Sequence, residues 1–226
     1  YMDNYNYHKG MNGIIQELKC LLKTKSIGTD SDRALLLDFQ ATLETKPEKA
    51  IKLEKDALAQ IETITADNAR LVSNLHANLG GLYRMNGHPD LAREHMEKSI
   101  SLLDQFNLLH INDSIPQIAN YAMFLTEQQE PERGISELQK LSGIIKEYHS
   151  DDCLDYAKVQ ETLGTIYLMT ANLPQAKTHF KRAFKIYEKI WADEPEMIEA
   201  KYQEIQELYP QIGFCIGKNL SGLLTK

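Results

Sequence analysis

The sequence repeats itself with a period of 42 residues, and this period constrains the fold more than any other feature. The segments HANLGGLY (76–83) and QETLGTIY (160–167) match each other at a distance of 84 residues. Each is followed at the same interval by a second matching segment, LAREHM (91–96) or QAKTHF (175–180), and a degenerate copy lies halfway between them. Pro47, Pro89 and Pro131 are also spaced by 42 residues, and Pro174 falls one residue late. The sequence therefore predicts tandem copies of one structural unit.

Each frame is predicted to form two α-helices. The first half carries apolar or small residues at helical spacing, for example Leu75, Leu79 and Leu82. A proline-containing turn then interrupts the chain, and the second half is an amphipathic helix of about four turns. No segment shows sustained alternation of apolar and polar residues, so strands are not expected. The predicted fold class is all-α, a solenoid of stacked antiparallel helix pairs.

The predicted organisation has three parts. Residues 1–30 form an N-terminal helix or cap, and residues 199–226 form a partial fifth repeat and a C-terminal cap. Between them lie four repeats, 31–72, 73–114, 115–156 and 157–198. Because the chain begins with Tyr1 rather than Met, we expect it to be part of a longer or processed polypeptide.

The matching segments resemble the tetratricopeptide repeat. Its signature, W-x2-L-G-x2-Y followed by A-x3-F, occurs here as L-G-x2-Y at 79–83 and 163–167, and as A-x3-M or A-x3-F at 92–96 and 176–180. The period is similar to that of the kinesin-light-chain type. The resemblance covers about residues 31–198 and implies a right-handed superhelix whose first helices line a concave face.

The sequence departs from the family pattern at several places. His76 and Gln160 replace the first aromatic residue of the signature, and the closing proline of the short repeat is missing. In the first frame, Asp38 and Glu54 stand where small or apolar residues are usual. These departures make the first repeat atypical without changing the predicted fold.

Composition excludes several functional classes. With 25 Lys and Arg against 32 Asp and Glu, the net charge of −7 does not favour nucleic-acid binding by this segment. No apolar run is long enough to span a membrane, and no signal-peptide pattern is present. The 3 cysteines are far apart and form no disulfide framework, which indicates a reducing, cytoplasmic location.

The sequence offers little for catalysis. The 7 histidines are dispersed, and no HExxH motif or His/Cys cluster at metal-ligand spacing occurs. His95 and His179 occupy equivalent places in two repeats, which favours a packing or surface role. We therefore expect no metal, no cofactor and no enzymatic activity.

The remaining candidate site is the concave face. Its predicted binding residues come from three repeats: Asn74, Asn78, Arg84, Met85, Asn120, Met123, Lys158, Thr162 and Met169. The methionines would give the face an adaptable apolar lining, although methionine at helical spacing is more often part of a core. Arg84 and Lys158 are isolated cations, with Glu127 and Glu161 nearby, so capture of an acidic C-terminal tail is not supported on this face.

Asn78 and Asn120 occupy the same place in successive repeats. Asparagine is a mediocre residue inside a helix, and its carboxamide can both donate and accept a hydrogen bond. In peptide-binding members of the family, an asparagine here holds the backbone of the ligand, and the resemblance implies that role for this pair. The alternative is that both side chains are solvated or bonded between helices.

The sequence therefore predicts a non-catalytic scaffold that binds a peptide or a partner helix in the concave groove. An alternative is the peptide-sensing regulatory domain of a larger bacterial signalling protein or transcription regulator, which would need a further domain upstream. An enzyme would need a pocket of converging titratable groups, which the sequence does not supply.

Overall fold

The computed structural model describes residues 13–17, 20, 28–112 and 114–208. These residues divide into two compact units, 1–117 and 118–226. The predicted N-terminal cap falls largely outside the described residues, and the C-terminal cap beyond residue 208 lies outside them entirely. The division into four frames of equal length stays a prediction.

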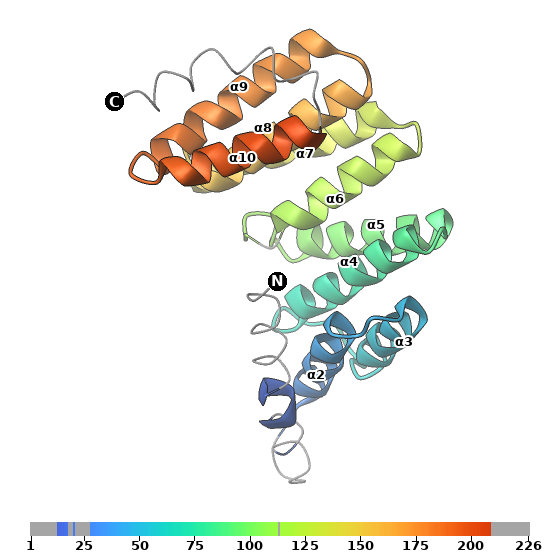
Figure 1. Ribbon diagram of the computed structural model, residues 1–226. Coiled ribbons are helices and arrows are strands. Elements are labelled where there is room, and N and C mark those ends of the chain that lie inside the picture. The colour runs from blue at the N-terminus through green and yellow to red at the C-terminus, as the bar shows by residue number, and fades with distance from the viewer. Residues whose placement is uncertain (1–12, 18–19, 21–27, 113, 209–226) are drawn as a thin grey trace. The chain divides into compact units, whose positions relative to one another are not determined.

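The first unit is built from helices that pack in antiparallel pairs (Figure 1). α2 (Asp30–Thr42) packs on α3 (Pro47–Leu58), and α4 (Ala69–Met85) packs on α5 (Pro89–Gln105). α3 also contacts α4, which joins the two pairs. The unit ends within the first turn of α6 (Ser114–Glu127).

The second unit continues with the rest of α6, followed by α7 (Pro131–Tyr148), α8 (Leu154–Met169), α9 (Leu173–Ile190) and α10 (Pro195–Leu208). α8 packs on α7 and α9, and α10 packs on α9. All regular structure in the described part of the chain is helical, so the predicted all-α arrangement of helix pairs is confirmed.

The prolines begin the second helix of each pair, as the sequence predicts. Pro47, Pro89 and Pro131 are the first residues of α3, α5 and α7, and Pro174 is the second residue of α9. The amide that proline lacks would have no partner within the helix at these positions. Proline therefore starts a helix here at little cost.

The turn before each of these helices has the same backbone form in three repeats. A residue with positive φ stands at positions spaced by 42 residues, and a backbone hydrogen bond closes each turn. This pattern is the Schellman motif, in which the carbonyl groups at the end of a helix find donors. The positive-φ residues are Gly87, Gln129 and Ala171, and the bonds join His88 N to Tyr83 O, Glu130 N to Leu125 O, and Asn172 N to Tyr167 O.

Small residues allow close contact within the pairs. A Cβ placed on Gly80 would lie 2.5 Å from Cγ of Met96, and one placed on Gly164 would lie 2.8 Å from the Phe180 ring. The large side chain of the second helix therefore fills the space that glycine leaves on the first.

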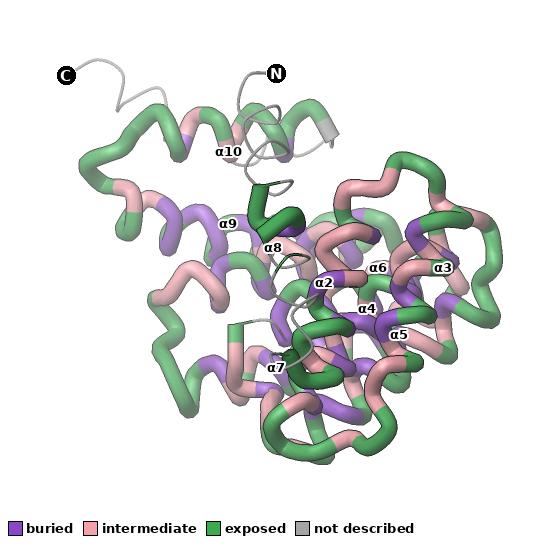
Figure 2. Tube along the Cα trace, turned by 90° about the horizontal axis from the view of Figure 1, so that it is seen from below, coloured by how far each residue is buried: buried purple, intermediate pink, exposed green. Residues whose placement is uncertain are grey.

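The core follows from this packing. Along α9, buried positions recur on one side and exposed positions on the other, as Figure 2 shows, whereas α8 is buried or half-buried around most of its circumference. Leu168, Phe180, Phe184 and Ile205 form one buried cluster of α8, α9 and α10. The helices are thus held by apolar burial between neighbours, and their outer faces are available for other roles.

Candidate functional site

Asn78 lies on α4 above a pair of acidic residues from the preceding helix pair. Its Nδ2 donates to Oδ1 of Asp38 on α2 at 2.9 Å and to Oε1 of Glu54 on α3 at 3.2 Å. Both hydrogens of the amide are thereby used within the molecule. The side chain is nevertheless exposed, so its Oδ1 is the atom that can accept a hydrogen bond from a ligand.

The two carboxyl groups beneath Asn78 share a proton. Burial raises the pKa of Glu54 to about 9, and the charge of Asp38 adds to the rise. Burial also raises the pKa of Asp38, against hydrogen bonds from Glu54 and Asn78 that lower it. Glu54 is therefore protonated at neutral pH and donates to the Asp38 carboxylate. Only 2% of Glu54 is exposed, and its Oε2 has no hydrogen-bond partner among the described residues.

The sequence pattern marks these two acids as unusual without predicting their role. Asp38 and Glu54 lie 42 residues before Gly80 and Met96, the pair that touches between α4 and α5. The period therefore indicates that the two acids meet between α2 and α3. The period does not indicate that both acids lie beside Asn78, because Asn78 belongs to the next repeat.

Asn74 is tied into a buried polar network at the end of the first unit. Its Oδ1 accepts from Nε2 of Gln117 at 2.6 Å. Oε1 of Gln117 in turn accepts from the hydroxyl groups of Ser73 at 2.8 Å and Ser99 at 2.6 Å. The network connects α4, α5 and the start of α6, so Asn74 has a clear structural role.

The other two candidates of the first unit lie at the end of α4. Arg84 is half-buried, whereas Met85 is 74% exposed and is the most exposed of the large apolar side chains in the described residues. An exposed methionine offers an adaptable apolar contact. Asn78 and Met85, one polar and one apolar, are thus the accessible candidates on this helix.

The candidates of the second unit lie on α6 and α8. Asn120 is exposed, and its side chain makes no hydrogen bond within the described part of the chain, while Met123 is half-buried. On α8, Lys158 is exposed and lies 3.8 Å from Asp155, and Thr162 donates to the carbonyl of Lys158 in its own helix.

Met169 ends α8 and is 46% exposed. Of the candidates in this unit, Asn120, Lys158 and Met169 are therefore accessible to a ligand, as Asn78 and Met85 are in the first unit.

A polar cluster that the sequence did not indicate ties α10 to the rest of the second unit. Glu161 on α8 accepts from the hydroxyl of Tyr187 at 2.6 Å and lies 2.8 Å from Nζ of Lys201. Burial and the Glu161 carboxylate raise the pKa of Tyr187. Burial would lower the pKa of Lys201, but Glu161 and Glu204 outweigh it and raise that pKa. Glu161 therefore holds three helices together.

Two of the histidines bond across a helix pair in equivalent ways. Nδ1 of His95 lies 2.9 Å from Nδ1 of His76, and Nδ1 of His179 lies 2.9 Å from Oε1 of Gln160. Burial lowers the pKa of His76 to about 4, and the neighbouring His95 adds to the effect. The tyrosines at 83 and 167 stack on these rings. The contacts describe a packing role for both histidines.

Among the described residues, no group of three or more His, Cys, Asp or Glu side chains is placed to hold a metal ion. None of the helices in the described part of the chain combines the length and apolarity needed to cross a bilayer.

The helix pairs and their shared turns define a helical-repeat architecture. The tetratricopeptide-repeat family model matches residues 114–189 of this chain. The resemblance drawn from the sequence is thereby confirmed over those residues. Such repeats bind proteins or peptides and are typically non-catalytic, which supports a general role in protein interaction. No curated protein sequence matches the chain.

Solved structures share this fold. BtubC (BKLC) from P. vanneervenii superposes with a TM-score of 0.72 at 18% identity, over 96% of this chain and 90% of that one. A candidate kinesin light chain of Podosopora anserina with nearly identical TPR-like repeats gives a TM-score of 0.62 at 15% identity, over 82% of this chain and 92% of that one. MamA superposes with a TM-score of 0.55 at 16% sequence identity, over 83% of this chain and 94% of that one. At these identities the likeness establishes the fold alone.

Proposed function

We propose that the chain is a non-catalytic scaffold whose first helices bind a peptide or a partner helix, with Asn78 and Asn120 holding the ligand backbone. The observation that carries the proposal is the state of Asn78. Its amide hydrogens are fixed by Asp38 and Glu54, and its exposed side chain keeps Oδ1 for a ligand N–H. An acceptor held in one orientation loses little freedom on binding.

Asn120 supports the proposal in a different way. It occupies the same place one repeat later, is exposed, and has no hydrogen-bond partner among the described residues. A free carboxamide can offer both its donor and its acceptor to an extended backbone. The exposed methionines, Met85 in the first unit and Met169 in the second, would each offer apolar contact to a ligand of its own unit.

The test is binding of a peptide array by the purified chain and by two single variants. Asn120→Ala removes a side chain without internal partners, so it is expected to weaken the selected peptides by about 1 kcal/mol, or about fivefold, without changing stability. Asn78→Ala should weaken them at least as much, because it removes the acceptor and also frees the acid pair.

The matched control is Asn112→Ala, which changes an exposed asparagine in the turn before α6 and should bind like the wild type. Helicity of every variant is checked by circular dichroism. Unchanged binding by folded Asn120→Ala and Asn78→Ala would show that the asparagines are structural and would overturn the proposed clamp.

A further inference from the structure

The second unit has a basic surface on α9 that the peptide-binding proposal does not use. The exposed cations Lys181, Arg182 and Lys185 line a hollow of about 370 Å³ with Lys146 from the end of α7. That volume is within the range of ligand-binding pockets. The two acids that line the same hollow come from the turn between α7 and α8, at positions 151 and 152. With Tyr156 of α8, the hollow therefore combines groups from three helices and a turn.

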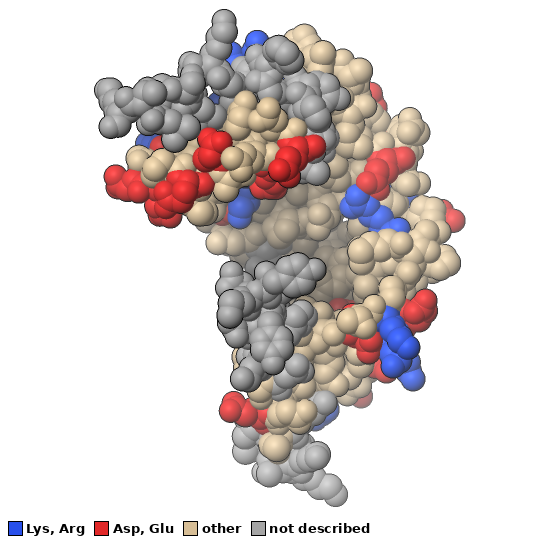
Figure 3. Space-filling view, viewed as in Figure 1, with Lys and Arg blue, Asp and Glu red and all other residues tan. Residues whose placement is uncertain are grey.

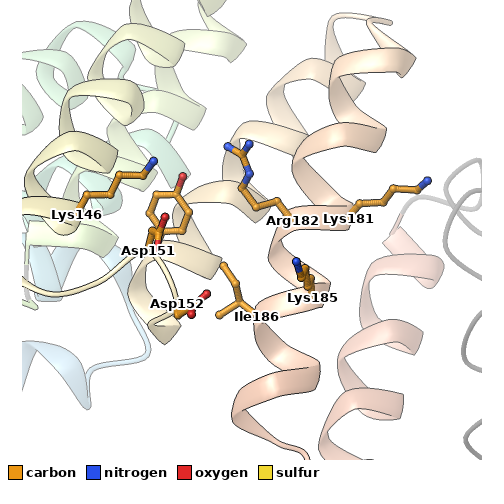
Figure 4. Close-up of a pocket in the computed structure, with 8 residues that line it drawn as sticks. Lys146, Asp151, Asp152, Lys181, Arg182, Lys185 and Ile186 are labelled. Carbon is orange, nitrogen blue, oxygen red and sulfur yellow. The ribbon is translucent and has the colours of Figure 1, made fainter.

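The side chains around the hollow are arranged for a ligand with negative charge. Figure 4 shows Lys146 and Arg182 extending toward each other from α7 and α9, whereas Lys181 extends away. Nζ of Lys146 lies 5.2 Å from the centre of the Tyr156 ring, which orients the ammonium group. Asp152 is engaged by Lys189 in an ion pair, which offsets part of the negative charge at this edge.

The repeat itself provides an internal comparison for these cations. Lys177, Lys181, Lys185 and Lys189 follow one another at four-residue spacing on α9, and the equivalent positions 84 residues earlier on α5 are Arg93, Glu97, Ser101 and Gln105. On α5 the first two members form an ion pair at 3.9 Å. The helix pair packs in both cases, so the stripe of cations on α9 is not a requirement of the fold.

Charge complementarity identifies the partner. The whole chain carries −7, so a concentrated positive surface on one helix is a local exception. On the face shown in Figure 3, carboxylates gather over the neighbouring α10, whose acidic residues are Glu196, Glu199, Glu204 and Glu207. Within the hollow itself, Asp151 and Asp152 lie beside the cations, so a uniformly charged polyanion would meet like charges there. A peptide with a few acidic side chains can meet the cations alone.

We propose that the hollow between α7 and α9 is a second binding site, which takes an acidic segment of a protein partner. Arg182 and Lys185 bind its carboxylates, and Lys146 closes the opposite side. The buried side chains of Tyr156 and Ile186 form an apolar floor under the segment. The site is independent of the asparagines and would remain if the proposed clamp failed.

The test is fluorescence anisotropy with a labelled Glu-rich peptide that has one central leucine, beside its Gln-substituted counterpart. The wild type is expected to bind the acidic peptide, more weakly at high salt because the charges are exposed. Arg182→Glu/Lys185→Glu should weaken that binding about tenfold or more, and Arg182→Gln/Lys185→Gln by a smaller factor. Asn120→Ala should leave it unchanged.

The control variant is Lys49→Glu/Lys52→Glu, which makes the same change in net charge at two exposed lysines of α3 in the first unit. It should bind the acidic peptide within about twofold of the wild type. Equal weakening by the control, no binding by the wild type, or equal binding of the Gln peptide would each overturn the proposal. Tighter binding to anionic vesicles or to a single-stranded oligonucleotide would overturn the assignment of a protein partner.

Discussion

The helix pairs α2–α3 and α8–α9 use the same contact position in opposite ways. In α8–α9, the ring of Phe180 lies against Gly164, and both are buried. In α2–α3, the equivalent residues are Asp38 and Glu54, two acids that share a proton between them. The repeat therefore accepts either an aromatic ring on glycine or a carboxyl pair at one place.

The difference teaches what each pair contributes. An apolar contact stabilises by removing surface from water, whereas a buried acid loses hydration, and Oε2 of Glu54 finds no hydrogen-bond partner among the residues that the structure describes. The acid pair does give Asn78 of the next repeat two acceptors, which the side chains of a glycine and a phenylalanine cannot do. The first pair thus contributes less packing energy, and in return it fixes the exposed carboxamide of Asn78 on α4.

The largest expected effect comes from removing the apolar member of this contact. Phe180→Ala should lower the free energy of unfolding by about 3–5 kcal/mol, because Phe180 is fully buried and leaves a cavity. Urea titration followed by the fluorescence of Trp191, which stacks on Tyr187, reports the second unit. Phe180→Leu, as the control, should cost clearly less. A loss of less than about 1 kcal/mol for Phe180→Ala would show that the contact is not the anchor of the pair.

An effect of opposite sign is expected at the equivalent acid. Glu54→Gln should raise the free energy of unfolding at neutral pH by about 1–2 kcal/mol. Glutamine is already neutral, whereas Glu54 must take up a proton when the chain folds. The folded state raises the pKa of Glu54 from 4.5 to about 9, so it holds a proton that the unfolded chain releases. The contribution of Glu54 to the stability of the wild type is therefore complete below the unfolded-state pKa of 4.5. It falls as the pH rises from there to the folded-state pKa of about 9.

The measurement is urea unfolding by circular dichroism at about pH 5 and about pH 8. The wild type should show a lower free energy of unfolding at the higher pH, and most of this difference should be absent in Glu54→Gln. Glu48→Gln, an exposed acid on the same helix, is the matched control and should keep the wild-type profile. A Glu54→Gln variant less stable than the wild type at the higher pH would contradict the shared proton.

The smallest expected effect concerns the left-handed residues in the turns that precede α5 and α9. Gly87 and Ala171 have φ of 73° and 58° at equivalent positions. Glycine adopts this conformation freely and alanine does not, so Ala171→Gly should stabilise by up to about 1 kcal/mol and Gly87→Ala should destabilise by a similar amount. Thermal unfolding of the two variants checks the sign. A stabilising Gly87→Ala together with a destabilising Ala171→Gly would show that the entropy of the unfolded chain outweighs the strain of the left-handed conformation at both positions.

The sequence predicts the fold well because its signals repeat. The proline spacing, the small residues and the helical periodicity all indicate the same pairs, and the structure contains them. The turns are a partial exception, because the left-handed residue is Gln129 in one repeat and Ala171 in another, and neither marks such a turn by its type. The pairing of Asp38 with Glu54 could be inferred from the period, but their protonation depends on burial.

The candidate site was harder to predict because it depends on contacts between repeats. Asn74 and Asn78 look alike in sequence, yet one is tied to Gln117 and the other lies exposed over an acid pair. The basic hollow joins Lys146 to a stripe on α9, and nothing in the local pattern links the two helices. Sequence periodicity indicates which face a residue occupies, whereas its partners come from packing.

The ion pair between Lys201 and Glu161 has a consequence for how α10 opens. In a linear repeat each helix is stabilised mainly by its neighbours, so a helix with few contacts opens before the others. Here α10 is attached to α8 by a half-buried charge pair and to α9 through the apolar cluster with Ile205. Opening of α10 would therefore have to break contacts with two helices at once, so α10 is expected to unfold cooperatively with α8 and α9.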